Sequence, residues 1–168
     1  MSDFKEMNPE ALTENAFHLI GKDWMLVTAK NNDSVNTMTA SWGGMGVMWG
    51  RNVAYVVIRP QRYTKEFIDF SDTFSLTFFK NEYRKELSYL GRVSGRDEDK
   101  ISNSGLTLDY ANDTPYFKEG KLVMICKKLY AKEMEEGSFF DQEILNKWYP
   151  NNDLHTMYIA EITQVLKK

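Results

Sequence analysis

Cationic and hydroxyl side chains follow one of the most apolar segments of the chain. Arg59 and Arg62 carry guanidinium groups, and the hydroxyls of Tyr63 and Thr64 come next. A helix is predicted at residues 65–71, so these groups lie at its start. Guanidinium groups bind phosphate through charge-assisted hydrogen bonds, and helix N-termini attract the same anion. The pattern predicts an anion clamp for a phosphate group, or alternatively a solvated turn in which Thr64 caps the helix.

The segment 36–42, which precedes this clamp, has two chemically different faces. One face consists of Asn36, Met38 and Ala40, the other of Thr37, Thr39 and Ser41, and Trp42 follows. A period of two predicts a β-strand, one face of which carries small hydroxyl groups. Together with the clamp, such a strand suits a flat cofactor with a phosphate tail. The alternative is an exposed strand whose Thr and Ser side chains face solvent.

A cluster of glycines follows Trp42. Gly43, Gly44 and Gly46 predict a flexible turn. The spacing from Gly44 through Gly46 to Gly50 does not match the dinucleotide-binding fingerprint, and an apolar strand at 53–58 follows where that motif requires a helix. The sequence therefore excludes a Rossmann-type site.

Side chains that could act as nucleophiles or metal ligands are scarce. The histidines are His18 and His155, and the single cysteine is Cys126, within an apolar segment. Two histidines do not form a metal site without carboxylates, and one cysteine excludes an internal disulfide. Cys126 is predicted to be an inert core residue. No serine-histidine-aspartate arrangement is recognisable, so a hydrolase is not predicted.

Length and composition predict one domain spanning residues 1–168. The chain has no apolar run of about 18 residues and no visible signal peptide, which predicts a cytoplasmic protein without membrane association. A formal net charge of −3 argues against nucleic acid as the main partner. The aromatic content of 14% suggests a broad interface or a binding site for a flat ring.

The predicted elements describe a mainly β protein with peripheral helices. Helices are predicted at 8–20 and 81–91, and residues 133–150 are predicted to form a long excursion that packs through its aromatic side chains. The remaining predicted strands lie at 25–29, 74–79, 106–109, 122–131 and 155–162. Because strands and helices do not alternate regularly, a barrel or sheet with helices at its periphery is expected.

Several segments in a fixed order resemble the flavin reductase-like family, and most closely its flavoredoxin-type branch. They are NTMTASW, the glycine cluster, RPQRYT, SGRDEDK and HTMYIAEI, and the resemblance covers residues 24–165. It implies a split β-barrel that binds FMN. One departure is visible at residues 48–52, where many family members have paired prolines before the second strand.

The resemblance also implies positions around the cofactor. Residues 36–42 should run along the isoalloxazine ring and ribityl chain, and Arg59, Arg62 and Thr64, with Tyr63 beside them, should face the phosphate. A neighbouring loop should close the site through Ser94, Gly95 and Lys100, and His155 should reach it from the last strand.

The activity implied by the resemblance is hydride transfer from NAD(P)H to flavin. The flavin itself performs such chemistry, so no side chain is expected to act as acid, base or nucleophile. A flavoredoxin-type electron carrier that receives electrons from a redox protein is the alternative. A homodimer with FMN near the subunit boundary is expected, and Trp42, Trp49 and Trp148 are candidates for stacking on a nicotinamide.

Overall fold

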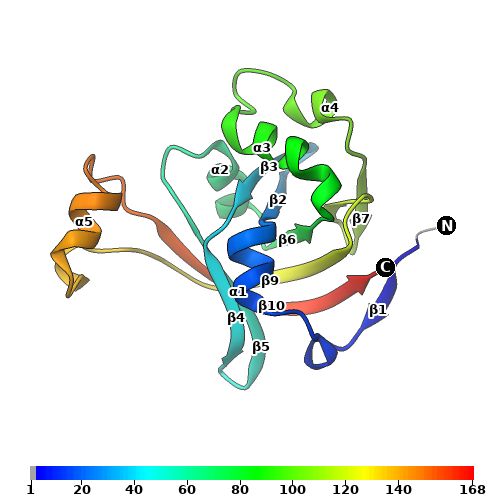
Figure 1. The fold of residues 1–168 in the computed structure, drawn as a ribbon, viewed down its shortest axis with the longest axis horizontal. Helices are drawn as coiled ribbons and strands as arrows, with labels where there is room; N and C mark the ends of the chain where they lie inside the picture. The colour runs from blue at the N-terminus through cyan, green and yellow to red at the C-terminus, as the bar shows by residue number, and fades with distance from the viewer. Residues whose placement is uncertain (1–2) are drawn as a thin grey trace.

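Antiparallel strands form the body of the molecule in this computed structural model, which describes residues 3–168 (Figure 1). The strands are β1 (Lys5–Met7), β2 (Met25–Asn31), β3 (Ser34–Ala40), β4 (Gly43–Met48), β5 (Arg51–Ile58), β6 (Thr73–Phe78), β7 (Leu108–Ala111), β8 (Thr114–Phe117), β9 (Leu122–Glu133) and β10 (Thr156–Lys167). One sheet has the order β3-β2-β6-β9-β10-β5-β4, with β1 beside β10, while β7 and β8 form a separate hairpin.

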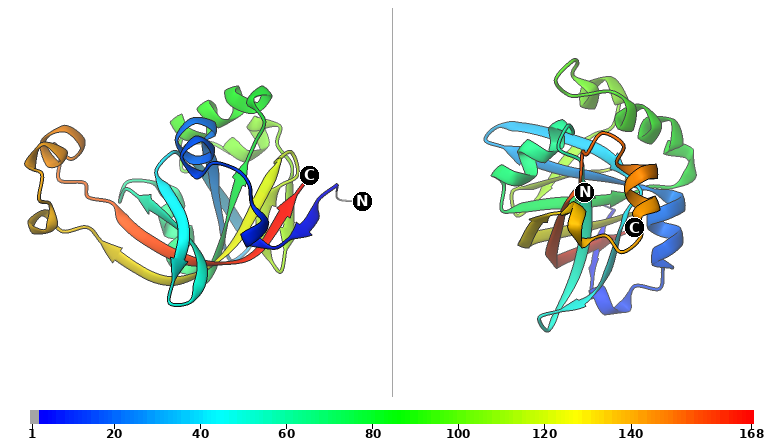
Figure 2. Two further views of the ribbon diagram at one scale, coloured as in Figure 1. Left: turned by 60° about the horizontal axis from the view of Figure 1, so that its bottom comes forward. Right: turned by 90° about the vertical axis from the view of Figure 1, so that its left-hand side faces the viewer.

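Short helices surround this sheet. They are η1 (Pro9–Ala11), α1 (Ala16–His18), the π-helical turn η2 (Leu19–Asp23), α2 (Tyr63–Phe70), η3 (Asn81–Tyr83), α3 (Arg84–Arg92), α4 (Lys100–Ser104), η4 (Glu136–Ser138) and α5 (Gln142–Trp148). The sheet is strongly curved, as Figure 2 shows. The expected mainly β fold with peripheral helices is confirmed.

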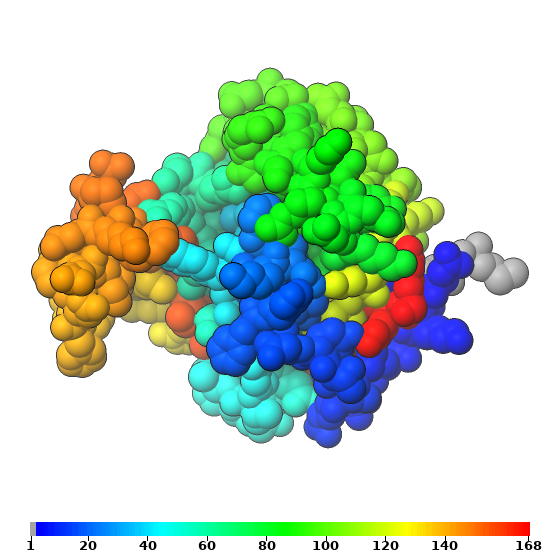
Figure 3. Space-filling model, viewed as in Figure 1, coloured from blue at the N-terminus to red at the C-terminus, as the bar shows by residue number. Residues whose placement is uncertain are grey.

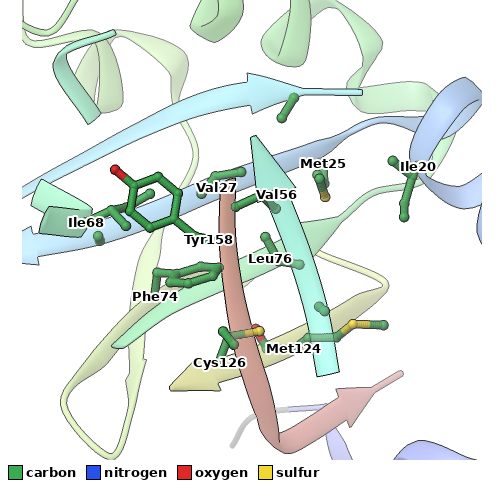
Figure 4. Packing of buried hydrophobic residues seen from close by; sticks show 14 of the residues in the cluster. Ile20, Met25, Val27, Val56, Ile68, Phe74, Leu76, Met124, Cys126 and Tyr158 are labelled. Carbon is green, nitrogen blue, oxygen red and sulfur yellow. The ribbon is translucent and has the colours of Figure 1, made fainter. Parts of the chain in front are cut away.

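The main core lies on the inner face of the curved sheet. Val27 of β2, Phe74 of β6 and Tyr158 of β10 pack there with Ile68 of α2, and all four are fully buried (Figure 4). Cys126 belongs to the same cluster, and its burial raises the pKa of the thiol. Its predicted position in the core is confirmed.

The long strands β9 and β10 carry a lobe formed by residues 134–155, which stands apart from the barrel in Figures 2 and 3. The lobe has a small core of its own, in which Leu145, Tyr149 and Leu154 are buried and Met134 and Phe139 pack against them. The predicted excursion thus packs through Tyr149 and Phe139.

The predicted glycine turn at 43–46 is wrong, because these residues form strand β4. The chain reverses instead at Trp49 and Gly50, whose φ angles of 54° and 68° are those of a tight hairpin turn. The reason lies on the neighbouring strand, where Tyr55 covers Gly44: a Cβ at Gly44 would lie 2.5 Å from Tyr55 Cε1. The glycines permit a close approach inside a strand rather than a bend.

The predicted continuous helix at 8–20 is also wrong. Asn8 accepts a hydrogen bond from the amide of Glu10 and starts only the turn η1, whereas Asn15 accepts one from His18 and starts α1. Two capping side chains in one segment favour two short starts over one helix. Strands β1 and β8 were not predicted, and the strand expected at 106–109 begins at Leu108.

Within residues 3–168, no helix is long and apolar enough to cross a bilayer. The same part of the chain contains no group of three or more His, Cys, Asp or Glu side chains placed to hold a metal ion. The histidines lie in different environments: His18 pairs with Asp23 at 3.3 Å on the surface, while His155 is buried.

Candidate cofactor site

Two neighbouring cavities lie beside strand β3. The first, of about 280 Å³, includes Trp42 and Trp148 in its walls and is called the tryptophan cavity. The second, of about 140 Å³, is lined by Arg62, Arg92 and Lys100 and is called the basic cavity. Met38 and Arg62 line both, so the two cavities adjoin along this part of the chain. Together they offer space for an elongated molecule with chemically different ends.

The structure brings the predicted site residues together around these cavities. Asn36, Met38, Arg62, Tyr63, Thr64, Ser94 and Lys100 line the basic cavity. The walls of the tryptophan cavity include Met38, Thr39, Ala40, Ser41, Trp42, Arg59, Arg62 and His155. Gly95 lies so close to Asn36 that a Cβ at position 95 would collide with Asn36 Oδ1.

No carboxylate lines the basic cavity, although three cationic side chains do. Lys100 is buried, and its ammonium group donates to the carbonyls of Leu90 at 2.9 Å and Val93 at 3.0 Å. Burial, and then the neighbouring charge of Arg62, lower the pKa of Lys100 to about 8. An anion in this cavity would offset both the burial of the Lys100 charge and its repulsion by Arg62, so the arrangement favours a negatively charged ligand.

Arg62 and Asn36 are held in place by the elements around the basic cavity. Arg62 donates from Nη1 to the carbonyl of Gly91 at 3.0 Å, and burial lowers the pKa of its guanidinium group. Asn36 Nδ2 donates to Thr64 Oγ1 at 2.9 Å, which joins β3 to the first turn of α2. Thr64 lies inside α2, whereas the sequence pattern predicted that it precedes the helix.

The hydroxyl face of β3 is used within the protein. Thr37 Oγ1 donates to the carbonyl of Val27 at 3.1 Å, and Thr39 Oγ1 donates to the carbonyl of Leu87 on α3. The opposite face, with Met38 and Ala40, contributes to the main core. The predicted two-faced strand exists, but its threonine hydroxyls already have partners in the fold.

Aromatic rings form much of the wall of the tryptophan cavity. Trp42 and Trp148 meet edge to face with 4.9 Å between ring centroids, and His155 lies 5.2 Å from Trp42. His155 Nδ1 shares a hydrogen bond of 2.6 Å with the hydroxyl of Tyr149. Burial, and then the charge of Arg59, lower the pKa of His155 to about 4. The ring is therefore neutral near pH 7.

Arg59 belongs to the tryptophan cavity rather than to the basic cavity. Its guanidinium group pairs with the carboxylate of Asp153 at 2.9 Å and donates to the carbonyl of Trp148 at 2.8 Å. The predicted clamp of two arginines is thus divided, with Arg62 at the basic cavity and Arg59 holding the lobe. Sequence spacing could not separate them, because partners far along the chain decide the direction of each side chain.

Sequence reasoning did not assign Gly91 or Arg92 to the site, although the cationic Arg92 is a signal for anion binding. It also did not assign Val57, Gln61 and Val93, which line the cavities without a distinctive sequence pattern. Trp49, one of the candidates for stacking on a nicotinamide, lines neither cavity; it lies at the β4–β5 turn against Tyr130, with 6.3 Å between ring centroids.

Comparison with known families identifies the class of protein to which this fold and site belong. Residues 17–167 match the family described as "Flavin reductase like domain". The chain belongs to this family, and the predicted resemblance is confirmed. No curated protein matches the sequence.

Solved structures share the fold at low sequence identity. The FMN-binding domain of a flavin reductases-like enzyme from Shewanella baltica OS155 is 19% identical, with a TM-score of 0.72 over 99% of this chain and 78% of the other. Flavoredoxin of Desulfovibrio vulgaris (Miyazaki F) is 24% identical, with a TM-score of 0.67 over 96% and 75%. Flavin reductase PheA2 is 17% identical, with a TM-score of 0.63 over 87% and 79%.

Proposed function

We propose that this protein binds FMN, with the phosphate in the basic cavity and the isoalloxazine ring in the tryptophan cavity, and that it acts as an NAD(P)H-dependent flavin reductase. The observation that carries the proposal is the chemical contrast between adjoining cavities. One presents Arg62, Arg92 and Lys100 without a carboxylate, and the other adds the indole rings of Trp42 and Trp148 to Arg59 and Arg62. FMN combines a dianionic phosphate with a flat ring system, and so fits both.

The residues of this chain would bind and orient the group and shield it from water. Arg62 and Lys100 supply positive charge at the phosphate end, and the Asn36–Thr64 hydrogen bond keeps β3 and α2 together beside it. The lobe contributes Trp148 to the wall of the other cavity, and Arg59 fixes the lobe there. When bound, FMN supplies the capacity to accept a hydride or electrons.

A flavoredoxin-type electron carrier is the second candidate. The similarity in fold to a flavoredoxin supports it, as does the absence of a glycine fingerprint for a dinucleotide in the sequence. In this role a redox protein would deliver electrons to the same bound flavin, and NAD(P)H would not react.

Equilibrium dialysis against FMN tests cofactor binding, with retention expected at micromolar concentration. The FMN-loaded protein is then mixed with NADH or NADPH under anaerobic conditions in a stopped-flow spectrometer. Bleaching of the flavin with a saturable rate supports the reductase. Bleaching by a low-potential protein donor, but by neither nicotinamide, supports the carrier instead.

We further propose that the protein is a homodimer that uses the lobe. Phe140 of the lobe is fully exposed to solvent and Ile144 is partly exposed, and Trp148 is exposed to 41% although it lines the tryptophan cavity. Because the lobe stands apart from its own barrel, these side chains are accessible to a second copy of the chain. Light scattering of the FMN-loaded protein should report twice the mass of the chain, and a monomer at micromolar concentration would refute the dimer.

A further inference from the structure

A third cavity, of about 470 Å³, shares Ser41 and Trp42 with the tryptophan cavity but otherwise has separate walls. We call it the glycine cavity, because Gly21, Gly43 and Gly44 lie in its walls. The N-terminal helical segments α1 and η2 form one side, and strand β4 forms the other. Its volume lies within the usual range for small-molecule sites.

Glycines let the two sides of this cavity take their shape. Side chains at Gly43 and Gly44 are excluded, because a Cβ at Gly43 would collide with the carbonyl oxygen of Tyr55 and one at Gly44 with the Tyr55 ring. Gly21, by contrast, faces open space, since a Cβ there would meet no atom within 4 Å. The Tyr55 ring therefore packs directly on the backbone of β4, and the side formed by η2 stays open.

The chemistry of the walls is apolar and aromatic. No charged residue lines the glycine cavity, whereas Phe17, Trp42 and Tyr55 bring three aromatic rings to it. Phe17 exposes 89% of its surface, which is unfavourable for a phenyl ring without a partner. Within residues 3–168 the hydroxyls of Ser41 and Tyr55 make no side-chain hydrogen bond, so each remains able to bind a polar atom of a ligand.

We propose that the glycine cavity binds a flat, uncharged aromatic molecule that carries a hydroxyl or carbonyl group. Aromatic rings stack on or meet one another edge to face, and Phe17, Trp42 and Tyr55 offer such contacts to a ring bound in the cavity. The absence of charged walls disfavours phosphorylated ligands, which distinguishes this site from the basic cavity. The proposal rests on the walls of the glycine cavity alone and does not require FMN to be bound.

The test is a titration of the 15N-labelled, FMN-saturated protein with 2-naphthol, followed through the amide signals of the glycines. Gly21, Gly43 and Gly44 should shift saturably, and Gly105, Gly120 and Gly137, which lie elsewhere, should not. Phe17→Ser should weaken binding about three- to tenfold, the loss expected for one aromatic contact. Phe70→Ser is the matched control, because it removes an exposed phenyl ring of α2 that lines none of the three cavities, and it should leave the affinity unchanged.

Equal affinities of wild type and Phe17→Ser for 2-naphthol, or shifts at both sets of glycines, would overturn the proposal. Phe17 is exposed, so its replacement does not threaten folding. If Phe17→Ser instead converts a dimer to a monomer and 2-naphthol has no effect on the wild type, a second copy covers the cavity and the proposal is also overturned. Flavin absorbance reports FMN binding separately from the glycine amide signals. A protein that fails to bind FMN but still shows saturable glycine shifts with 2-naphthol would contradict only the proposed function.

Discussion

Arg59 and Asp153 form an ion pair of 2.9 Å that joins the end of β5 to the segment entering β10. Gln61 also donates to the Asp153 carboxylate, at 2.8 Å. These contacts draw the guanidinium group of Arg59 toward the lobe, whereas Arg62, three positions further along the chain, lines the basic cavity. The two arginines should therefore affect flavin binding differently.

Replacing Arg62 by Ala should weaken binding of FMN more than binding of riboflavin, which lacks the phosphate. Loss of a charge-assisted hydrogen bond costs about 1.5–3 kcal/mol, or roughly a ten- to hundredfold loss of affinity. Arg59→Ala is the matched control: it should loosen the lobe and weaken both flavins to a similar extent. Fluorescence titration with each flavin measures both effects. A selective loss of FMN binding in Arg59→Ala, with none in Arg62→Ala, would place the phosphate beside Arg59.

The affinity for FMN should fall as the pH rises through about 8. Burial lowers the pKa of Lys100 to about 8 in the free protein, so its positive charge is lost above that value. Bound phosphate stabilises the charged form and so raises the pKa of Lys100 in the complex, and the affinity should therefore decline as the pH rises above about 8. The ratio of FMN to riboflavin affinity, measured from pH 7 to 10, removes effects on the ring. Lys100→Met should make this ratio independent of pH, and a constant ratio in the wild type would contradict the assignment.

His155 should make the stability of the protein depend on pH in the acid range. Its pKa is lowered from 6.5 to about 4 in the native state, so between these values the unfolded chain binds more protons. The free energy of unfolding should therefore fall as the pH is lowered from about 6.5 to about 4, by at most roughly 3 kcal/mol. Urea denaturation of wild type and His155→Gln from pH 7 to 4 measures the slope. His155→Gln should flatten it; an identical slope in both proteins would exclude His155 as its source.

Gly95→Ala should weaken FMN binding without unfolding the protein. The added Cβ would collide with Asn36 Oδ1 and disturb the hydrogen bond from Asn36 to Thr64 beside the basic cavity. Gly46→Ala is the control, since its Cβ would meet no atom within 4 Å. Isothermal titration with FMN should show a loss in Gly95→Ala of about tenfold, comparable to one neutral hydrogen bond of about 1 kcal/mol plus local strain. An unchanged affinity would show that the loop yields to the methyl group.

Local patterns in the sequence were enough to predict much of the sheet. Strand β2 was predicted at 25–29, β3 from the alternation that starts at Asn36, and β6 from the apolar residues Phe74, Leu76 and Phe78. These predictions succeeded because the side chains of a strand alternate between its two faces, whatever its neighbours are. The predicted half-burial of β6 is wrong, because Ser75 and Thr77 on its other face are buried as well. The hairpin of β7 and β8 was missed in part, because such short strands carry little periodic signal.

The glycines show where local reasoning fails. Gly43 and Gly44 resemble a turn in sequence, yet they lie in β4 because the backbone and ring of Tyr55 occupy the space that a side chain would need. Tyr55 lies about ten residues further along the chain, and only the pairing of β4 with β5 brings it there. A glycine that permits a turn and a glycine that permits close packing look alike until the neighbour is known.

The sequence by itself determined which chemical groups the protein possesses and in what order they follow. It placed hydroxyls and arginines at spacings that predict a site for a flat, phosphorylated molecule, and its alternation of residues predicts the sheet; Lys100 was added to the site by the resemblance to a known family. The tertiary structure alone decided which of these groups share a cavity. Arg62 joined Lys100 in one cavity, while Arg59 turned to Asp153, 94 positions further along the chain, because ion pairs and hydrogen bonds form among the groups that folding brings together.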